Sequence, residues 1–531
     1  MIPMKRALAF LLILLVVPFV GAVRWGVVYN IKGSTYIQAG SPMFFGNTLY
    51  QAGLYEINYT KNSFYVLGLD PETGKLKFGE ELAFSYNGTR IWGKSFSGGS
   101  PAILRKLPNG DILLLFAAKR PNSMSAIIVA ELRKNGSVAW AKYYLLYGSF
   151  NNKVVARELI PIDAVVSDGE IYLLAETIEW SKPQLVLLKL SQTGDVIWIR
   201  SYVDSYAGLR PKGLAIGPDG NILALVGSLN PILLWFTKNG EIIKSVALDF
   251  GTPAGVVGPF VHGDEIYIAG HVKENGYFIP FIMAIDKTGN VLWAEKFPDA
   301  GYDFVSVKFG DKIYILGKAV SAFQKSNYNR RVWILSLDRK GKPVWNILTG
   351  DSAMIMDEYG GMTINDALYV VYYRNFIMAR GLVFMSVGKD GSVPCSHLSP
   401  EIKPTSLTVT IKQASLPKTE DLTVKVLQVS ADVNKLDISS SSLCPGSSPA
   451  STSSPRPTSS SSSSTSSSYP PIIQPSQTHT TKSSSSPIQS SSTHYSSTRE
   501  ITSSSTSKKS TCGPGLLIIL PLILLLKRRS L

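Results

Sequence analysis

Hydrophobic residues in the first 400 positions of the chain fall into short continuous runs separated by polar, glycine-containing turns. LVLLKL before Gly194 and VIWIRSY after it are one such pair. Their length and their β-branched and aromatic content are typical of buried strands joined by a tight hairpin. The pattern recurs seven times, and we number the repeats units 1 to 7. Their turn glycines are, in order, Gly74, Gly136, Gly194, Gly240, Gly289, Gly341 and Gly391.

Each hairpin is preceded by two further runs, which bring every unit to four predicted strands. GEIYLLA, DEIYIAG and DKIYILG are examples of the nearer run, and each is continuously apolar after a polar turn, as a strand buried on both faces should be. Four strands in a repeat of about 50 residues are the signature of a β-propeller. The sequence therefore predicts an all-β, seven-bladed propeller over residues 23–398.

The ends of this region indicate how the ring closes. Pro394 interrupts the last run of unit 7, whereas residues 23–30 contain Trp25 and Tyr29 at the spacing found in the outer strands of other units. We expect residues 23–30 to supply the outer strand of the last blade. The tryptophan that follows most turn glycines by four positions is interpreted as packing between blades.

These turns resemble the docking motif of quinoprotein-type (PQQ-like) propellers, Ala-x-Asp-x-x-Thr-Gly-x-x-x-Trp. The resemblance covers most of residues 23–398 and implies the fold alone, since the family includes both dehydrogenases and non-catalytic scaffolds. Two units carry most of the resemblance. In unit 1 the spacing is kept by Gly68, Asp70, Thr73, Gly74 and Phe78, with Gly and Phe in place of the motif's Ala and Trp, and in unit 5 it is kept one residue short by Ala284, Asp286, Thr288, Gly289 and Trp293. The other units keep little beyond the glycine and the tryptophan.

Two alternating stretches, SLTVTIKQ and DLTVKVLQVS, follow the last unit. They predict a β-hairpin appendage over residues 399–446. Cys395 and Cys444 bracket it, and in an exported protein we expect a disulfide between them. The alternative is a pair of unlinked thiols.

Residues 1–22 combine two cations, a short apolar run and small residues at the end, which predicts a signal peptide. The alternative is an uncleaved N-terminal anchor, although the run is shorter than the roughly 20 residues that a bilayer span needs.

Residues 447–511 hold 40 Ser or Thr among 65 positions and predict a disordered, O-glycosylated stalk. Residues 512–531 resemble the CGP-type C-terminal sorting signals of archaeal surface proteins, through Cys512-Gly-Pro-Gly, an apolar run and Lys527-Arg-Arg. The resemblance implies lipid attachment at Cys512. An unprocessed short membrane anchor is the alternative, and both place the head on the outer side of the membrane.

The chain carries 53 Lys and Arg against 38 Asp and Glu, a net charge of +15. Residues 1–22 and 447–531 contribute a net +9 of this charge, so the body is nearly balanced and has no basic run. We therefore expect no nucleic-acid partner.

Two sets of residues are candidates for a site at one end of the propeller. Asp163, Asp303, Asp357 and Glu358 precede predicted inner strands and are candidates for Ca²⁺ ligation or acid and base catalysis. The alternative is that they bind loop backbones. The ligand-binding candidates are Trp180, Tyr277, Tyr328 and Arg374, exposed aromatics and arginine suited to sugar rings or a protein partner, with ordinary loop packing as the alternative.

No metal beyond a Ca²⁺ option and no cofactor is predicted, because the histidines lack metal-ligand spacing. Three sequons, at Asn58, Asn87 and Asn135, are N-glycosylation candidates. Function is expected to be that of a surface-anchored binding or structural module of an archaeal envelope, with an extracellular polysaccharide or envelope protein as partner. The alternative, less favoured, is an enzyme: a carbohydrate-active hydrolase or lyase, or a quinone-dependent dehydrogenase. No catalytic motif supports it, nor does any histidine and Arg/Lys constellation for a quinone.

Overall fold

The computed structural model describes residues 24–443 apart from thirteen short gaps. The gaps are 58–60, 95–101, 122–123, 151–152, 180–181, 204–207, 228–229, 299–302, 321–329, 350–359, 377–378, 395–396 and 399–401. All regular structure in the described ranges is β, as predicted. The predicted signal peptide, the Ser/Thr-rich segment and the C-terminal tail lie outside these ranges, as do Cys395, Cys444 and Cys512. Within them, no helix is present that could cross a membrane.

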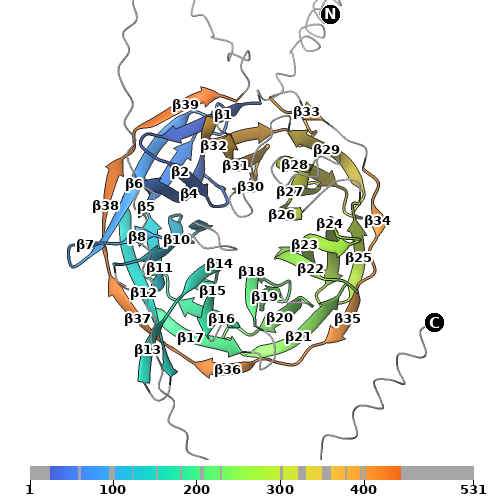
Figure 1. Ribbon diagram of the computed structural model, residues 1–531, viewed down its shortest axis with the longest axis horizontal. Coiled ribbons are helices and arrows are strands. Elements are labelled where there is room, and N and C mark those ends of the chain that lie inside the picture. Colours follow the sequence, from blue (N-terminus) through green and yellow to red (C-terminus); the bar gives the residue numbers. More distant parts are fainter. Residues whose placement is uncertain are drawn as a thin grey trace, which may run out of the picture. The chain divides into compact units, whose positions relative to one another are not determined.

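Units 3 to 7 each form a separate antiparallel sheet, arranged around a central channel as in a β-propeller (Figure 1). Each sheet has five strands, of which the first four come from the unit itself, from the channel outward. These strands are β14 (Ile160–Ser167), β15 (Glu170–Glu179), β16 (Lys182–Leu190) and β17 (Val196–Val203) in unit 3; β18 (Arg210–Ile216), β19 (Ile222–Gly227), β20 (Ile232–Phe236) and β21 (Ile242–Asp249) in unit 4; β22 (Ala254–His262), β23 (Glu265–Glu274), β24 (Tyr277–Asp286) and β25 (Val291–Lys296) in unit 5; β26 (Asp303–Phe309), β27 (Ile313–Val320), β28 (Arg330–Leu337) and β29 (Pro343–Thr349) in unit 6; and β30 (Gly360–Ile364), β31 (Leu368–Phe376), β32 (Ala379–Val387) and β1 (Gly26–Ile31) in unit 7.

The remaining two units share one 14-stranded sheet, so the expectation of seven separate blades is wrong: five blades are separate. The link is the short β8, which pairs with β5 through Gly93 and with β10 through Gly93 and Trp92. The strands are β2 (Tyr36–Ala39), β3 (Met43–Phe45), β4 (Thr48–Ile57), β5 (Lys61–Leu69), β6 (Leu76–Tyr86) and β7 (Thr89–Arg90) in unit 1, and β8 (Trp92–Gly93), β9 (Ala102–Lys106), β10 (Ile112–Lys119), β11 (Ser125–Leu132), β12 (Val138–Phe150) and β13 (Lys153–Arg157) in unit 2.

Buried apolar side chains in the described ranges gather between neighbouring units rather than within one. Each cluster takes residues from two consecutive units, and one of them joins unit 7 to unit 1 through Tyr29, Tyr65 and Phe384. The ring is thus held by face-to-face sheet packing all the way around. As expected, the N-terminal segment supplies the fourth strand of unit 7, because β1 pairs with β32 from Gly26↔Met385 to Tyr29↔Leu382.

The C-terminal part of the described chain is not a hairpin, which corrects the prediction for residues 399–446. Its strands pair with the outer strands of the units instead of with each other, and we call the described residues from 397 to 443 the belt. The belt consists of β33 (His397–Leu398), β34 (Thr405–Ser406), β35 (Thr410–Gln413), β36 (Lys418–Asp421), β37 (Thr423–Gln428), β38 (Ser430–Lys435) and β39 (Ile438–Ser442), which add to units 6, 5, 4, 3, 2, 1 and 7 in that order. It follows the rim of the ring (Figure 1).

The belt strands pair with the units because the outer edges of the units would otherwise be unpaired. A fourth strand without a partner leaves a row of unpaired backbone groups, and the alternating belt sequence satisfies them. Belt side chains that face the ring are apolar: Leu407, Leu427 and Leu443 are buried, while most of the intervening residues are exposed. The alternation predicted strands correctly but carried no information about which edge each would join.

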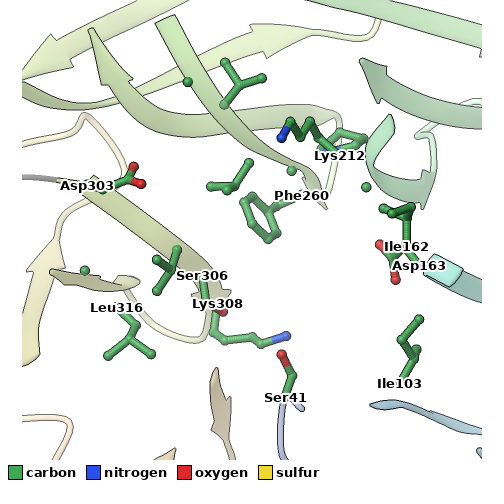
Figure 2. A pocket seen from close by; sticks show the side chains of 18 of the residues that line it. Ser41, Ile103, Ile162, Asp163, Lys212, Phe260, Asp303, Ser306, Lys308 and Leu316 are labelled. Carbon is green, nitrogen blue, oxygen red and sulfur yellow. The ribbon is translucent and has the colours of Figure 1, made fainter. Parts of the chain in front are cut away.

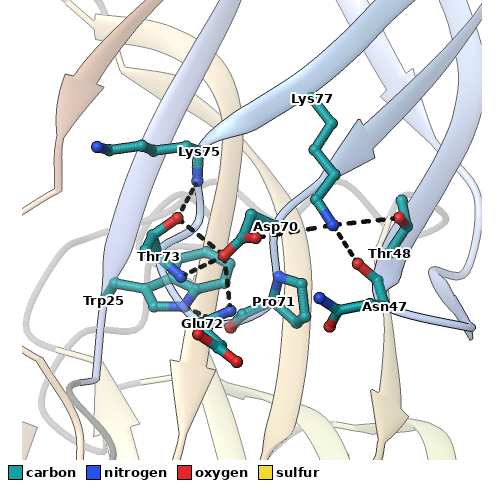
Figure 3. A network of polar contacts seen from close by, with 9 residues as sticks. All are labelled: Trp25, Asn47, Thr48, Asp70, Pro71, Glu72, Thr73, Lys75 and Lys77. Atoms are coloured by element: carbon teal, nitrogen blue, oxygen red, sulfur yellow. Dashed lines mark hydrogen bonds and ion pairs between the residues drawn. The ribbon is translucent and has the colours of Figure 1, made fainter.

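The seven turn glycines have positive φ, between 69° and 91°, as tight hairpin turns require. Tryptophans of one unit cover the turn glycines of the next. Trp25 donates a hydrogen bond from Nε1 to the carbonyl of Pro71 (2.8 Å), and a Cβ placed on Gly74 would lie 2.3 Å from its ring. Figure 3 shows Asp70 holding this turn by accepting hydrogen bonds from Thr73. The predicted packing of tryptophan between units is confirmed here.

Unit 4 covers the turn glycine of unit 5 with different residues. Lys244 occupies the position that holds tryptophan in units 2, 3, 5 and 6. Trp235 of the adjacent strand β20 takes over part of the role, since its Cη2 is 3.4 Å from a Cβ built on Gly289 and Lys244 Nζ is 3.2 Å from it. The amine also lies 5.1 Å from the Trp235 ring centroid. A cation and a displaced tryptophan therefore replace the usual docking residue.

Candidate functional site

A cavity with a volume of about 470 Å³ lies in the central channel. Its wall is formed mainly by the innermost strands β9, β14, β18, β22 and β26 of units 2 to 6 (Figure 2). We call this cavity the channel pocket. Its volume falls within the range of pockets that hold small organic ligands.

Backbone irregularities decide which side chains line the pocket. In units 3 to 6 the innermost strand shifts register against its neighbour. A β-bulge leaves residues unpaired and redirects side chains. The residues within these shifts are Ile162, Lys212, Gly258, Pro259 and Val305, and all of them line the pocket.

The described lining is rich in positive charge. Arg105, Lys212, Lys308 and Lys318 contribute cations, whereas Asp163 and Asp303 are the only described carboxylates. Even with His271 counted as neutral, the described lining carries a net charge of +2. Such a wall favours an anionic ligand, and the protein around it strengthens the attraction relative to water.

The carboxylate of Asp163 contacts residues of the channel wall with both of its oxygens. Its Oδ1 pairs with Arg105 Nη2 of unit 2, and its Oδ2 accepts a hydrogen bond from the Leu214 backbone N–H of unit 4 (2.9 Å). Arg105 also donates to the carbonyl of Ala164. One carboxylate therefore connects three consecutive units, which agrees with the alternative that such residues bind backbone.

Asp303 has a partner as well. Its Oδ1 lies 3.0 Å from His271 Nδ1, at ion-pair distance but without the geometry of a hydrogen bond. Both side chains are largely shielded, with 21% exposure each. His271 packs edge-on against Phe278 (centroid distance 4.7 Å).

Lys308 differs from the other charged residues of the pocket. It lies on β26, and no hydrogen bond or ion pair involves its amine in the described part of the chain. Figure 2 shows the side chain reaching across the pocket toward Ser41 and Asp163. Burial and, to a smaller extent, the charge of Arg105 lower the pKa of Lys308 to about 8, while Asp163 acts in the opposite direction. The side chain keeps partial exposure because it faces the cavity.

The predicted set of four acids is only partly visible. Asp163 and Asp303 both line the channel pocket, as expected of residues near inner strands, whereas Asp357 and Glu358 lie outside the described residues. In the described ranges no three metal-ligating side chains come together. Because each visible carboxylate has a cationic or imidazole partner, their arrangement does not resemble a free acid and base pair.

The described residues do not show whether the predicted ligand-binding aromatics and arginine lie close together, because the side chain of only one of the four is described. Tyr277 stands exposed (69%) at the tip of the β23–β24 hairpin, in a turn formed by Asn275 and Gly276. Trp180 and Tyr328 lie outside the described residues, and for Arg374 only the backbone, in β31, is described. A shared binding patch therefore stays a prediction.

Of the three sequons, two are visible and both asparagines are exposed. Asn87 has a positive φ of 47°, and Asn135 accepts hydrogen bonds at Oδ1 from the Ser137 backbone (3.1 Å) and hydroxyl (2.7 Å). Asn58 lies outside the described residues. Glycosylation stays a prediction.

Sequence reasoning missed Arg105, Lys212, Lys308 and His271. The only signal was a cation within an otherwise apolar inner-strand sequence, as in AILRK, RPKGLAI and FVSVKF. Which of these cations face the channel depends on bulges that the period of the sequence does not reveal.

The fold and the channel pocket define the class: an all-β propeller with a cationic central cavity. No family model and no curated protein sequence matches the chain. Among solved structures it is similar to virginiamycin B lyase from Staphylococcus aureus (10% identity over 68% of this chain and 99% of that chain, TM-score 0.41). Polysaccharide lyase Uly1 is similar too (11% identity over 66% of this chain and 89% of that chain, TM-score 0.41). So is the quinohemoprotein alcohol dehydrogenase of Comamonas testosteroni (10% identity over 70% of this chain and 77% of that chain, TM-score 0.38). Similarity at this level says nothing about the ligand or activity of this chain.

Proposed function

We propose that the protein is an exported, C-terminally anchored binding module whose seven-unit β-propeller takes a small acidic ligand in the channel pocket. An acidic sugar residue of an extracellular polysaccharide is the ligand class that fits the cavity volume. The observation that carries this proposal is the net positive lining, in which Lys308 has no described partner while both described carboxylates have one.

Display at the outer face of an archaeal envelope is the second part of the proposal. It is supported by the sequence of residues 1–22, by the Ser/Thr-rich segment and by the apolar tail with Cys512. Intact-mass measurement of the protein from membrane extracts tests it. A chain that lacks residues 1–22 and carries a lipid at Cys512 is expected, and an unmodified full-length chain would contradict it.

Calorimetric titration of the full-length chain tests the ligand class. Methyl α-D-galacturonide should bind, whereas the uncharged methyl α-D-galactoside should not, because the pocket attracts the carboxylate. Lys308→Met should weaken binding at least about tenfold, the loss of one charge-assisted contact. Lys412→Met, on the belt, is the matched control and should bind as the original does. Equal binding of both sugars, or of both lysine variants, would contradict the proposal.

A second candidate ligand is an anionic quinone cofactor. The observation that favours it is that Arg105, Lys212, Lys308 and His271 all line the channel pocket, although Arg105 and His271 also face Asp163 and Asp303 there. These side chains would neutralise the carboxylates of pyrroloquinoline quinone. Dye reduction by the quinone-loaded chain with sugars or alcohols would favour a dehydrogenase; its absence, with sugar binding intact, favours the binding module. The hydrolase or lyase alternative gains no support from Asp163 and Asp303.

A further inference from the structure

We propose that Lys308 forms a reversible imine with a ligand that carries both an acidic group and an aldehyde or ketone. The inference rests on the proposed function, because the cationic pocket is what would bring such an acid to the amine. It assigns a covalent step, carbonyl capture, to a propeller whose sequence contains no catalytic motif.

The position of Lys308 suits this step. The side chain comes from an innermost strand and crosses a cavity of about 470 Å³, so a ligand of a few carbon atoms can approach the amine inside the ring. Two other lysines with low exposure are held by carboxylates: Lys142 contacts Asp195 (2.6 Å) and Lys296 contacts Glu274 (2.7 Å). No such carboxylate contact occupies Lys308 in the described chain. A deprotonated amine would therefore have its lone pair available.

Most of the charged groups around the pocket disfavour the protonated form of the Lys308 amine. Among the described lining residues, Arg105, Lys212 and Lys318 add positive charge, and only Asp163 and Asp303 oppose them. Positive surroundings and burial both disfavour the ammonium form, which agrees with the lowered pKa of about 8. A desolvated lysine near other cations is one of the recognised ways to obtain a nucleophilic amine at neutral pH.

The reaction balances without an oxidant or reductant. The neutral amine nitrogen attacks the carbonyl carbon, a C–N bond forms as the C=O π bond breaks, and one proton passes through solvent from nitrogen to oxygen to give a carbinolamine. The hydroxyl oxygen then takes up a second proton, the C–O bond breaks and water leaves, and the nitrogen lone pair completes the C=N bond as the nitrogen releases its second proton to solvent. The products are the imine and one water molecule, and hydrolysis reverses both steps.

Reductive trapping of the full-length chain with glyoxylate and cyanoborohydride tests the inference. The reductant fixes any imine as a carboxymethyl-lysine, which peptide mass mapping locates. We expect Lys308 to be labelled at least about tenfold faster than Lys412, an exposed lysine that pairs with Asp249, because burial raises the free-amine fraction of Lys308. Labelling of Lys308 should rise between pH 6 and 8. Lys308→Arg should lose the fast-labelled site, while Lys412→Arg should keep it.

Glycolate, which has the carboxylate but no carbonyl, separates the two proposals. Protection of Lys308 by glycolate, together with fast labelling, supports the imine at the anion site. Glycolate binding without preferential labelling of Lys308 overturns the imine and leaves the proposed function standing. Fast labelling that glycolate does not slow overturns the inference as stated, since the acid would not be bound there. Unchanged thermal unfolding of Lys308→Arg shows that loss of labelling is not loss of fold.

Discussion

The outer rim and the channel wall belong to the same sheets, yet the strands at the rim are regularly paired and most of those at the channel wall are bulged. At the rim each unit receives an added belt strand, so the outer strands are paired for part of their length, with regular register. At the channel wall of units 3 to 6 the innermost strands are bulged and leave Lys308 without a described partner. Regular strand pairing thus lies at the rim and apolar burial between the units, while the channel wall contains bulges and a lysine without a described partner, as binding sites do.

Removal of the belt should have the largest effect on the rim. A chain that ends before His397 loses a strand from every unit and the burial of Leu407, Leu427 and Leu443. We expect the free energy of unfolding to fall by more than about 5 kcal/mol, from three buried leucines at roughly 1.5 to 3 kcal/mol each. Exposed outer edges should also promote aggregation. Chemical unfolding measures the first and light scattering the second.

A chain ending at Gly446 is the control for that deletion, since it keeps the belt and loses only the segments that follow. It should unfold as the full-length chain does. Similar stability of the two truncated chains would mean that the belt is dispensable and that the rim is not where the ring is secured.

Gly341→Ala should come next, because it disturbs the packing between units 5 and 6. The residue has a φ of +83°, and a Cβ there would lie 2.7 Å from the Trp293 ring. Strain and displacement of the tryptophan should together cost about 3 kcal/mol. Gly220→Ala separates the two causes: φ is +78° but nothing lies within 4 Å of its Cβ, so only about 1 kcal/mol is expected. Equal losses in chemical unfolding would contradict the docking role.

Lys308→Met should raise the free energy of unfolding at neutral pH, whereas the belt deletion and Gly341→Ala should lower it. The pKa of Lys308 is about 8 in the folded chain and 10.5 without the fold, so the unfolded state binds more protons between these values. The stability of the original chain should therefore rise from pH 8 to 10.5. Below pH 8 the variant should be more stable by about 2 kcal/mol, less than the full shift implies because the channel admits solvent. Its advantage should vanish near pH 10.5.

Denaturant midpoints at pH 7, 9 and 10.5 measure this trend for Lys308→Met against the original chain. Lys412→Met provides the control and should show no such convergence. A variant that is less stable at every pH would indicate that the lysine supports the channel wall rather than burdening it.

Lys412→Ala should have the smallest effect. The residue reaches from the belt to Asp249 Oδ2 (2.5 Å), but it is 59% exposed. Exposed ion pairs contribute about 0 to 1 kcal/mol. We expect a loss below about 1 kcal/mol, smaller still at high salt. A larger loss in chemical unfolding would show that the belt is held by charge and not by strand pairing and leucines.

Local signals in the sequence were sufficient for much of the fold. The turn glycines, the outer strand from Trp25 onward and the tryptophan packing follow from spacing, because each depends on residues close together in one unit or repeated in the next. The path of the belt does not, since the alternation around Leu427 defines a strand and its inner face but not its partner. The link through Gly93 between units 1 and 2 is similarly a matter of long-range pairing.

The channel pocket was predicted only through its carboxylates. Asp163 and Asp303 could be placed because they stand near the start of inner strands. Lys212 sits at a register shift that the sequence period does not mark, and Lys308 occupies a strand whose composition is otherwise apolar. His271 pairs with Asp303 across two units, a contact between residues 32 positions apart that no motif announces.

The direction of the belt has a consequence for how the protein is made. Units emerge from the ribosome in chain order, but the belt visits them from unit 6 back to unit 1 and then joins unit 7 beside β1. Every outer edge therefore stays without its added strand until all seven units have been synthesised. A chain that terminates before the belt would leave the outer edge of every unit unpaired, and such edges promote association between chains.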